Sequence, residues 1–312
     1  MTITAKIIAD SINPRGTRIT TFELVYPRMI HSELMTHRMF SRNSASSRAI
    51  PVKSMLDLIE ADPAMPVHWG KNQPGMQANE ELNEIDKKSV QGLWFTACKE
   101  AVSVARVMND IGAHKQVINR ITEPYQHMKV VLTATDGAYE NWFWLRDHKD
   151  ADPTIHELAS KMKVEYDGSD PVNLKFGEWH LPYVNVIHDC DIVGNSLNKY
   201  YAGDKDDPSS WVEVNLEQAL MISASCCAQV SYRKTDGSLE KSETVFKRLI
   251  ESEPMHASPV EHQALCFDNK YYWPVGTTHR DKNGVYYSGN LKDYIQYRQL
   301  IPNNAKGSWK VN

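Results

Sequence analysis

The segment THRMFSRNSASSR, residues 36–48, decides how this chain is interpreted. It gathers basic side chains and hydroxyl groups directly after a predicted helix, and its composition over residues 41–48 predicts a loop. Such a loop can offer hydroxyls, backbone N–H groups and guanidinium groups to a phosphate. A solvated surface turn explains the same composition, so the segment alone leaves both interpretations open.

The residues on both sides of this segment predict a mixture of strands and helices. Strands are expected at 3–9, 17–26, 129–135 and 264–267. Helices are expected from Pro27 to about Phe40 and at 86–111, 116–120, 138–148, 152–164, 216–229 and 242–252. Residues 167–211 show no sustained period and predict an irregular linking region, and residues 273–312 predict a strand-rich tail with a short helix in LKDYIQYRQLI. The pattern predicts an α+β protein.

The longest expected helix, at 86–111, carries one apolar stripe at helical spacing. Its members are Val90, Leu93, Trp94, Ala97, Ala101, Val104, Met108 and Ile111. Gly112 is placed to end this helix, because glycine is common just after the last helical residue.

Composition excludes several classes of protein. The chain has 35 Lys and Arg against 39 Asp and Glu, a net charge of −4, which argues against a DNA-binding or membrane-surface protein. A hydrophobic fraction of 41% argues against general disorder. There is no apolar run long enough for a membrane span, and MTITAKIIADS does not resemble a signal peptide, so a cytoplasmic location is expected. The 5 cysteines lack CxxC spacing and predict neither a disulfide framework nor a structural zinc site.

Two arginines, Arg120 and Arg146, are expected on helices that flank the strand at 129–135. Both lie beside apolar or aromatic neighbours in sequence. An arginine in such surroundings needs an anionic or multi-acceptor partner. That partner is either a ligand or a structural carboxylate, with Glu123 and Asp147 as the nearest candidates.

The segment HASPVEH, residues 256–262, places two histidines around a glutamate. Its spacing does not match the helical HExxH pattern, and Pro259 interrupts any helix, so a metal site is disfavoured. A capped loop that enters a strand explains it. The residues alone therefore indicate an anion-binding, nucleotide-binding α+β protein and do not reach a reaction.

Taken together, these segments resemble the flavin-dependent thymidylate synthases, whose signature is RHRxxSxNxxSxR. Residues 36–48 keep every defining position except the first arginine, which Thr36 replaces. NRITEP at 119–124 is similar to the family's ARxxLP segment, and NWFWLR at 141–146 is similar to its NxxxFLxLR-type helix.

Two further family segments stand in an unexpected order. AQVSY at 228–232 and HASPVEH at 256–262 resemble segments that precede the signature in the family. The order is that of a circular permutant, which is allowed when old and new termini lie close together at the surface. The resemblance thus implies a thymidylate synthase-like α+β fold, an antiparallel sheet with helices, in permuted order. Residues 1–166 would hold the signature, 167–211 would link, and 212–312 would complete the same fold.

The resemblance also implies a role for individual residues. FAD would be bound by His37, Arg38, Asn43, Asn141, Ser231 and Ser258. The nucleotide dUMP would be bound by Glu33, Ala45, Ser46, Arg48, Arg120 and Arg146. Arg146, Arg120 and His256 would be catalytic, and no metal is implied.

The reaction implied is reductive methylation of dUMP to dTMP, with methylenetetrahydrofolate and NADPH as co-substrates, in a homotetramer. Four positions depart from the family: Thr36, Ser44, Val117 and Gly137. The departures keep two alternatives open. One is a flavin-dependent pyrimidine deoxynucleotide hydroxymethylase or related modification enzyme, and the other is a non-catalytic nucleotide-binding or RNA-binding protein.

Overall fold

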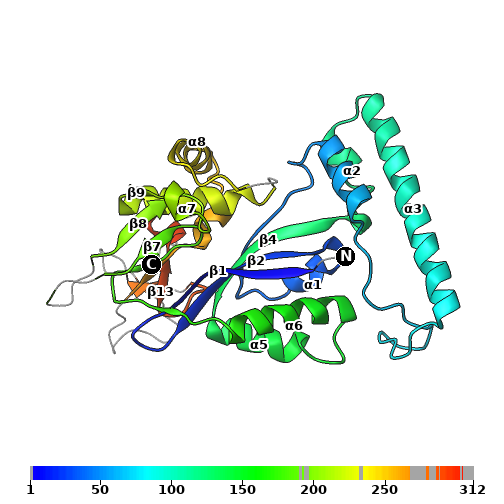
Figure 1. Cartoon of the computed structure of the whole chain (residues 1–312), viewed down its shortest axis with the longest axis horizontal. Coiled ribbons are helices and arrows are strands. Elements are labelled where there is room, and N and C mark those ends of the chain that lie inside the picture. The colour runs from blue at the N-terminus through cyan, green and yellow to red at the C-terminus, as the bar shows by residue number, and fades with distance from the viewer. Residues whose placement is uncertain are drawn as a thin grey trace, which may run out of the picture.

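A five-stranded sheet in the order β3-β4-β2-β1-β5 forms the centre of the computed structural model (Figure 1). The structure describes residues 3–189, 192, 197–231, 235–267, 279–280, 286–287, 289–302 and 304. The strands of this sheet are β1 (Thr4–Ile12), β2 (Arg18–Pro27), β3 (Ser41–Ser44), β4 (His127–Thr135) and β5 (Val172–Asn173). All their pairings are antiparallel except that of β1 with β5. The predicted α+β class is confirmed, with antiparallel pairing dominant.

The hairpin between β1 and β2 shows why the longest strands form where the sequence predicts them. Asn13 Oδ1 accepts hydrogen bonds from the backbone N–H groups of Arg15 and Thr17, and Gly16 supplies the positive φ that the turn requires. Beyond the turn, the alternate residues Phe22 and Leu24 are fully buried. The turn chemistry and the alternation agree, so the register of the sheet is well specified.

Two helices, α5 (Asp136–Arg146) and α6 (Pro153–Asp167), cover one face of this sheet (Figure 1). Asp152 caps α6 by accepting from the backbone N–H groups of Thr154 and Ile155. Tyr139 and Trp142 of α5 are fully buried, and Tyr139 packs edge-on against Phe22 of β2. This face carries the largest apolar cluster and fixes the position of α5.

The C-terminal part of the chain contacts the other face of the sheet. It contributes α7 (Leu216–Ala228), η4 (Gln229–Ser231), α8 (Leu239–Ile250), η5 (Ser258–Glu261) and two strands of the three-stranded sheet β13-β10-β6, whose third strand, β6, comes from the region 167–211. The strands of that sheet are β6 (Trp179–His180), β10 (Ala264–Cys266) and β13 (Tyr294–Gln296). Between the two sheets runs a chain of hydrogen bonds. His180 contacts Thr21 at 2.8 Å, Thr21 contacts Thr133 at 2.7 Å, and Thr133 contacts His262 at 2.8 Å.

The helix α3 (Glu84–Asp110) corrects the expected apolar stripe. The helix buries Cys98, Val102 and Ala105, whereas Leu93 is 69% exposed and Val104 is 50% exposed. Figure 1 shows the reason: α3 stands at the margin of the molecule beside α2 (Val52–Ala61) and away from the sheet. The narrow contact with α2 covers only one side of the helix.

Short elements account for the remaining differences from the sequence prediction. Residues 41–44 form the edge strand β3, not a loop, and the helix expected over 27–40 is limited to η1 (Arg28–Ile30) and α1 (His31–Met35). The region 167–211 contains β5, β6, β7 (Asn185–Ile187), β8 (Lys199–Ala202) and η3 (Pro208–Ser210), and β9 (Val212–Val214) follows it. Strands of two to four residues are too short to show a period in sequence. The proposed division of the chain at 166 and 212 stays a prediction.

The tail is described in part. Residues 268–278 and 305–312 lie outside the described residues. LKDYIQYRQLI contains β13 and only one helical turn, α9 (Tyr297–Leu300), so the expected helix is shorter than predicted. The other short elements are α4 (Lys115–Ile118), η2 (Glu123–Tyr125), β11 (His279–Arg280) and β12 (Tyr286–Tyr287). None of the helices in the described part of the chain combines the length and apolar character needed to span a membrane.

Candidate functional site

The first half of the signature segment and the helix α5 line one cavity of about 640 Å³, here called the signature cavity. Its lining includes Thr36, His37, Arg38, Asn141, Arg146 and Lys292. Two of the four departures from the family pattern, Thr36 and Gly137, also line it. The volume lies in the range of ordinary small-molecule sites.

Arg146 lies at the centre of the hydrogen bonding in this cavity. Its Nε donates to His37 Nε2 at 3.0 Å, and its Nη1 forms an ion pair with Glu33 Oε2 at 2.9 Å. Asp147, which the sequence offered as a structural partner of Arg146, has other partners. Its carboxylate lies 3.3 Å from His156 Nε2 and also accepts from the Ser160 hydroxyl. Three predicted site residues, Glu33, His37 and Arg146, are therefore in direct contact.

His37 is held between aromatic rings and guanidinium groups. Its ring stacks at 5.9 Å on Phe40 and meets Trp142 edge-on at 4.7 Å, measured between ring centroids. Burial first, and then the positive charges of Arg146 and Arg42, lower the pKa of His37 to about 4. His37 is therefore neutral near pH 7, although the sequence groups it with the basic residues.

The second half of the signature segment faces the C-terminal part of the chain. Ser258 donates to Asn43 Oδ1 at 2.8 Å, and the backbone N–H of Ser46 donates to Ser231 Oγ at 3.0 Å. Four predicted site residues are thereby in contact, and Ala45 packs in the same small apolar cluster as Cys227. AQVS and HASPVEH thus lie beside the signature in space. Tyr232, the last residue of the AQVSY segment, lies outside the described residues.

The pleat of β3 separates these two groups of residues. Ser41 and Asn43 point toward the C-terminal part, where Gln296 Nε2 donates to Ser41 Oγ at 2.7 Å. Arg42 points the other way and donates to the His37 carbonyl at 3.0 Å. Neither His256 nor Ser258, to which the resemblance gives roles in catalysis and in flavin binding, lines the signature cavity. His256 is exposed, with Nε2 at 3.5 Å from Ser258 Oγ.

Arg120 and the end of the signature, where Arg48 is exposed, form a third location. Arg120 is exposed and pairs with Glu123 at 3.1 Å, so the structural carboxylate considered for it is present. Glu123 also accepts from Ser47 Oγ at 3.2 Å and pairs with Arg28 at 3.0 Å. The end of the signature and Arg120 are thus linked through one carboxylate. Arg120 is not among the residues that line the signature cavity.

The residues of the signature cavity fit a flavin. Arg38 is exposed and has no described partner for its guanidinium, so it can pair with a phosphate. Lys292 was missed in the sequence analysis, because nothing but its own positive charge marks this position in the sequence. The cavity volume, the rings of His37 and Phe40 and the exposed guanidinium of Arg38 together suit a planar ring that carries a phosphate group.

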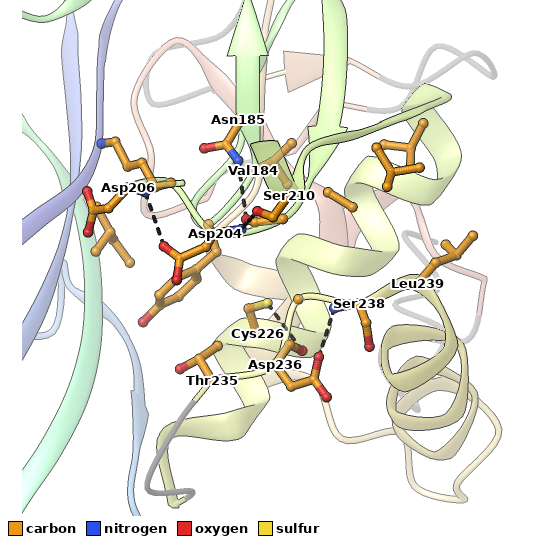
Figure 2. Close-up of a pocket in the computed structure, with 18 of the residues that line it drawn as sticks. Val184, Asn185, Asp204, Asp206, Ser210, Cys226, Thr235, Asp236, Ser238 and Leu239 are labelled. Carbon is orange, nitrogen blue, oxygen red and sulfur yellow. Dashed lines mark hydrogen bonds between the residues drawn. The ribbon is translucent and has the colours of Figure 1, made fainter. Parts of the chain in front are cut away.

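A second cavity, of about 890 Å³, lies between β1, β2 and the sheet β7-β8-β9. Figure 2 shows Asn185 of β7, Asp204, Ser210 of η3, Cys226 of α7 and Asp236 around it. None of the residues that the sequence predicted as site residues lines it.

Neither a metal nor a cysteine nucleophile is indicated by the described residues. No group of three or more potential metal-ligating side chains is found among them. Cys98, Cys226, Cys227 and Cys266 are buried and form no disulfide among the described residues, and burial raises the pKa of Cys226 to about 12. A thiol with such a raised pKa is a poor nucleophile.

Comparison with known proteins gives partial structural likeness only. No protein-family model and no curated protein matches the chain. The UMP/dUMP methylase PolB from Streptomyces cacaoi bound with 5-Br dUMP is similar at 14% identity and a TM-score of 0.45, over 53% of this chain and 90% of PolB. The complex of PolB with 5-Br UMP is similar at 16% identity and a TM-score of 0.45, over 53% of this chain and 88% of PolB. Thymidylate Synthase X (ThyX) from Helicobacter pylori with FAD and dUMP is similar at 17% identity and 0.33, over 47% and 67%.

Proposed function

We propose that this chain is a flavin-dependent thymidylate synthase-like enzyme, which converts dUMP to dTMP with methylenetetrahydrofolate and NADPH. One observation carries the proposal: His37 and Arg38 of the signature line one cavity with Asn141 and Arg146, which come from a segment one hundred residues away. The signature resemblance supports the same assignment. When bound, the FAD would supply the hydride that completes the methyl group.

Two groups of residues, one at each half of the signature, would bind different parts of the flavin cofactor. His37, Arg38 and Asn141 would hold the flavin within the signature cavity. Asn43 of β3, Ser258, which donates to it, and Ser231, which accepts from Ser46, would hold the remainder of the same cofactor. His256, two residues before η5, would act near the reacting atoms.

The nucleotide would be bound by the end of the signature and by two arginines. Ser46 and Arg48 would offer a hydroxyl and a guanidinium to its phosphate, and Ala45, whose own N–H donates to the Lys129 carbonyl, would lie beside them. Arg120 would assist at this end, where its side chain is exposed. Arg146, with Glu33 beside it, would stabilise negative charge that develops on the pyrimidine carbonyl oxygens.

We further propose that the enzyme is a homotetramer in which copies complete one another's sites. The observation behind this is that Arg120 and Arg146 do not line one cavity within the described chain. Light scattering of the flavin-loaded protein should give the mass of four chains. A flavin-loaded, active monomer would contradict the proposal.

The experiment that tests the function begins with the colour of the purified protein. Bound FAD should give a flavin absorption spectrum, and NADPH should bleach it. Turnover of dUMP labelled with deuterium at C5, with methylenetetrahydrofolate present, should release the label and give dTMP. A colourless protein that binds nucleotide but releases no label would favour the non-catalytic alternative.

The hydroxymethylase alternative is favoured by one specific observation. Thr36 and Gly137 both replace residues that the family resemblance places on the flavin, and both line the signature cavity. A changed flavin pocket could leave the one-carbon unit unreduced. Mass spectrometry of the nucleotide product separates a methyl from a hydroxymethyl group in the same assay.

A further inference from the structure

We propose that Glu33 and Arg146 fix His37 as a neutral imidazole with its proton on Nδ1, which donates a hydrogen bond to a ring acceptor of the ligand in the signature cavity. The part about the imidazole stands on the geometry of the chain alone. The part about the ligand rests on the proposed function, with the flavin ring as the ligand.

The direction of one hydrogen bond determines the tautomer. A guanidinium has five N–H donors and no acceptor. Because Arg146 Nε donates to His37 Nε2 at 3.0 Å, that ring nitrogen must carry a lone pair. A neutral imidazole with Nε2 as acceptor keeps its proton on Nδ1.

Glu33 holds the arginine that sets this tautomer. Its carboxylate pairs with Arg146 Nη1 at 2.9 Å, which leaves Nε directed at His37. Asp147, the neighbour of Arg146 in sequence, pairs with His156 instead. Glu33 has no described contact with His37 itself, so it is a positioning residue that acts through Arg146.

The surroundings of His37 keep it uncharged. The two guanidinium groups nearest to it belong to Arg146 and Arg42, and Arg42 Nη1 also binds the His37 carbonyl oxygen at 3.0 Å. A protonated His37 would lose the bond from Arg146 and face two like charges. The two carboxylates that line the cavity, Asp136 and Glu140, have no described contact with His37. The remaining charged groups there, Arg38 and Lys292, are also positive.

A neutral donor selects a particular kind of ligand atom. His37 Nδ1 has no described partner and is not among the buried polar atoms that lack one. A neutral N–H suits a carbonyl oxygen or a ring nitrogen, whereas a phosphate binds more strongly to a cation. The exposed Arg38 offers that cation. The two consecutive residues would thus bind different parts of one ligand: His37 would bind its ring and Arg38 its phosphate.

Nitrogen-15 NMR of the full-length protein, labelled at histidine and free of ligand, tests the imidazole. His37→Gln assigns the signal. We expect a protonated Nδ1 and an unprotonated Nε2 at pH 7. Glu33→Gln should keep this pattern, because its amide oxygen still accepts from Arg146. Glu33→Ala and Arg146→Ala should move the proton toward Nε2, which free imidazole prefers, and the control Glu140→Gln should change nothing. A wild-type His37 protonated on Nε2, or on both nitrogens, overturns the proposal.

Titration with FAD tests the ligand. An asparagine amide can occupy the position of Nδ1, whereas a glutamine amide lies closer to that of Nε2. His37→Asn should therefore retain most of the affinity for FAD, and His37→Gln should weaken it about tenfold, the worth of one hydrogen bond. Equal losses in both variants overturn the assignment of Nδ1 to the ligand. A wild-type protein with the predicted tautomer and no affinity for FAD overturns the proposed function and leaves the tautomer assignment standing.

Discussion

Ser258 Oγ donates a hydrogen bond to Asn43 Oδ1 at 2.8 Å, across 215 residues of sequence. Asn43 also donates from Nδ2 to the carbonyl oxygen of Cys227 at 2.6 Å. One amide side chain thus joins the edge strand β3 to both η5 and the end of α7. This is the neighbourhood that a permuted order of family segments requires, while the permutation itself stays a prediction.

Asn43→Ala should lower the free energy of unfolding by about 2–3 kcal/mol, because it removes two hydrogen bonds and leaves a buried carbonyl group without its partner. Ser258→Ala should cost about 1 kcal/mol, since only one bond is lost. Chemical denaturation measures both. Ser44→Ala is the matched control on the same strand, where a change within about 0.5 kcal/mol is expected. Equal stability of Asn43→Ala and wild type would show that β3 is not tied to the C-terminal part.

Arg146→Ala should abolish turnover while FAD still binds at saturating concentration. Its guanidinium would act on the pyrimidine, so its removal should cost about 2–4 kcal/mol of transition-state stabilisation. The measurement is kcat with dUMP in the FAD-loaded protein, with Lys149→Ala as a control for the loss of one exposed positive charge on the following loop. An unchanged kcat in Arg146→Ala would remove this residue from the catalytic set.

The long, regular elements were predictable because their residues repeat. The strands β1, β2 and β4 and the helices α3, α5, α6 and α7 all lie close to their expected ranges. The sequence predicts a loop in place of the strand β3, because all four residues of this strand, SRNS, are polar. Those polar groups are used in tertiary contacts with η5 and β13, which no local pattern reveals.

The candidate site was predictable as a set of residues and not as an arrangement. The signature resemblance supplied His37 and the NWFWLR resemblance supplied Arg146, but the sequence offered Asp147 as a partner of Arg146 only because it is adjacent. The actual partner, Glu33, lies 113 residues away and meets Arg146 through the packing of α1 beside α5. Successive residues of the signature point to opposite faces of the sheet because they lie in the strand β3. This alternation could not be predicted, because the sequence predicts a loop at these positions.

The buried histidines should make the protein less stable in acid. Burial lowers the pKa of His180 to about 4 and that of His262 to about 3, so both are neutral in the folded state at pH 5. In the unfolded chain each histidine takes up a proton below about pH 6.5. The unfolded state is therefore stabilised relative to the folded state as the pH falls. Each histidine should therefore remove about 1.4 kcal/mol of stability per pH unit between about pH 6 and its folded pKa.

His262→Asn tests this slope, because an asparagine amide can still contact Thr133 from the position of Nδ1 and cannot titrate. The free energy of unfolding, measured from pH 7 to pH 4.5, should fall less steeply than in wild type by about one proton. His148→Asn, at an exposed position, should leave the slope unchanged. A parallel pair of curves for His262→Asn and wild type would mean that His262 is already accessible to protons in the folded protein.

Truncation after residue 210 should remove FAD binding and solubility together. The fragment keeps the signature cavity's residues on α5 but loses Ser231, His256 and Ser258, which face the second half of the signature. It also loses β10, whose residues Ala264 and Leu265 pair with β6, and the contact of His262 with Thr133. An uncovered strand edge and an exposed apolar face favour aggregation. Co-expression of residues 211–312 should restore a soluble complex, because the missing strand and caps would return. A soluble 1–210 fragment with unchanged affinity for FAD would make the C-terminal third a separate domain, and the permuted order would have to be abandoned.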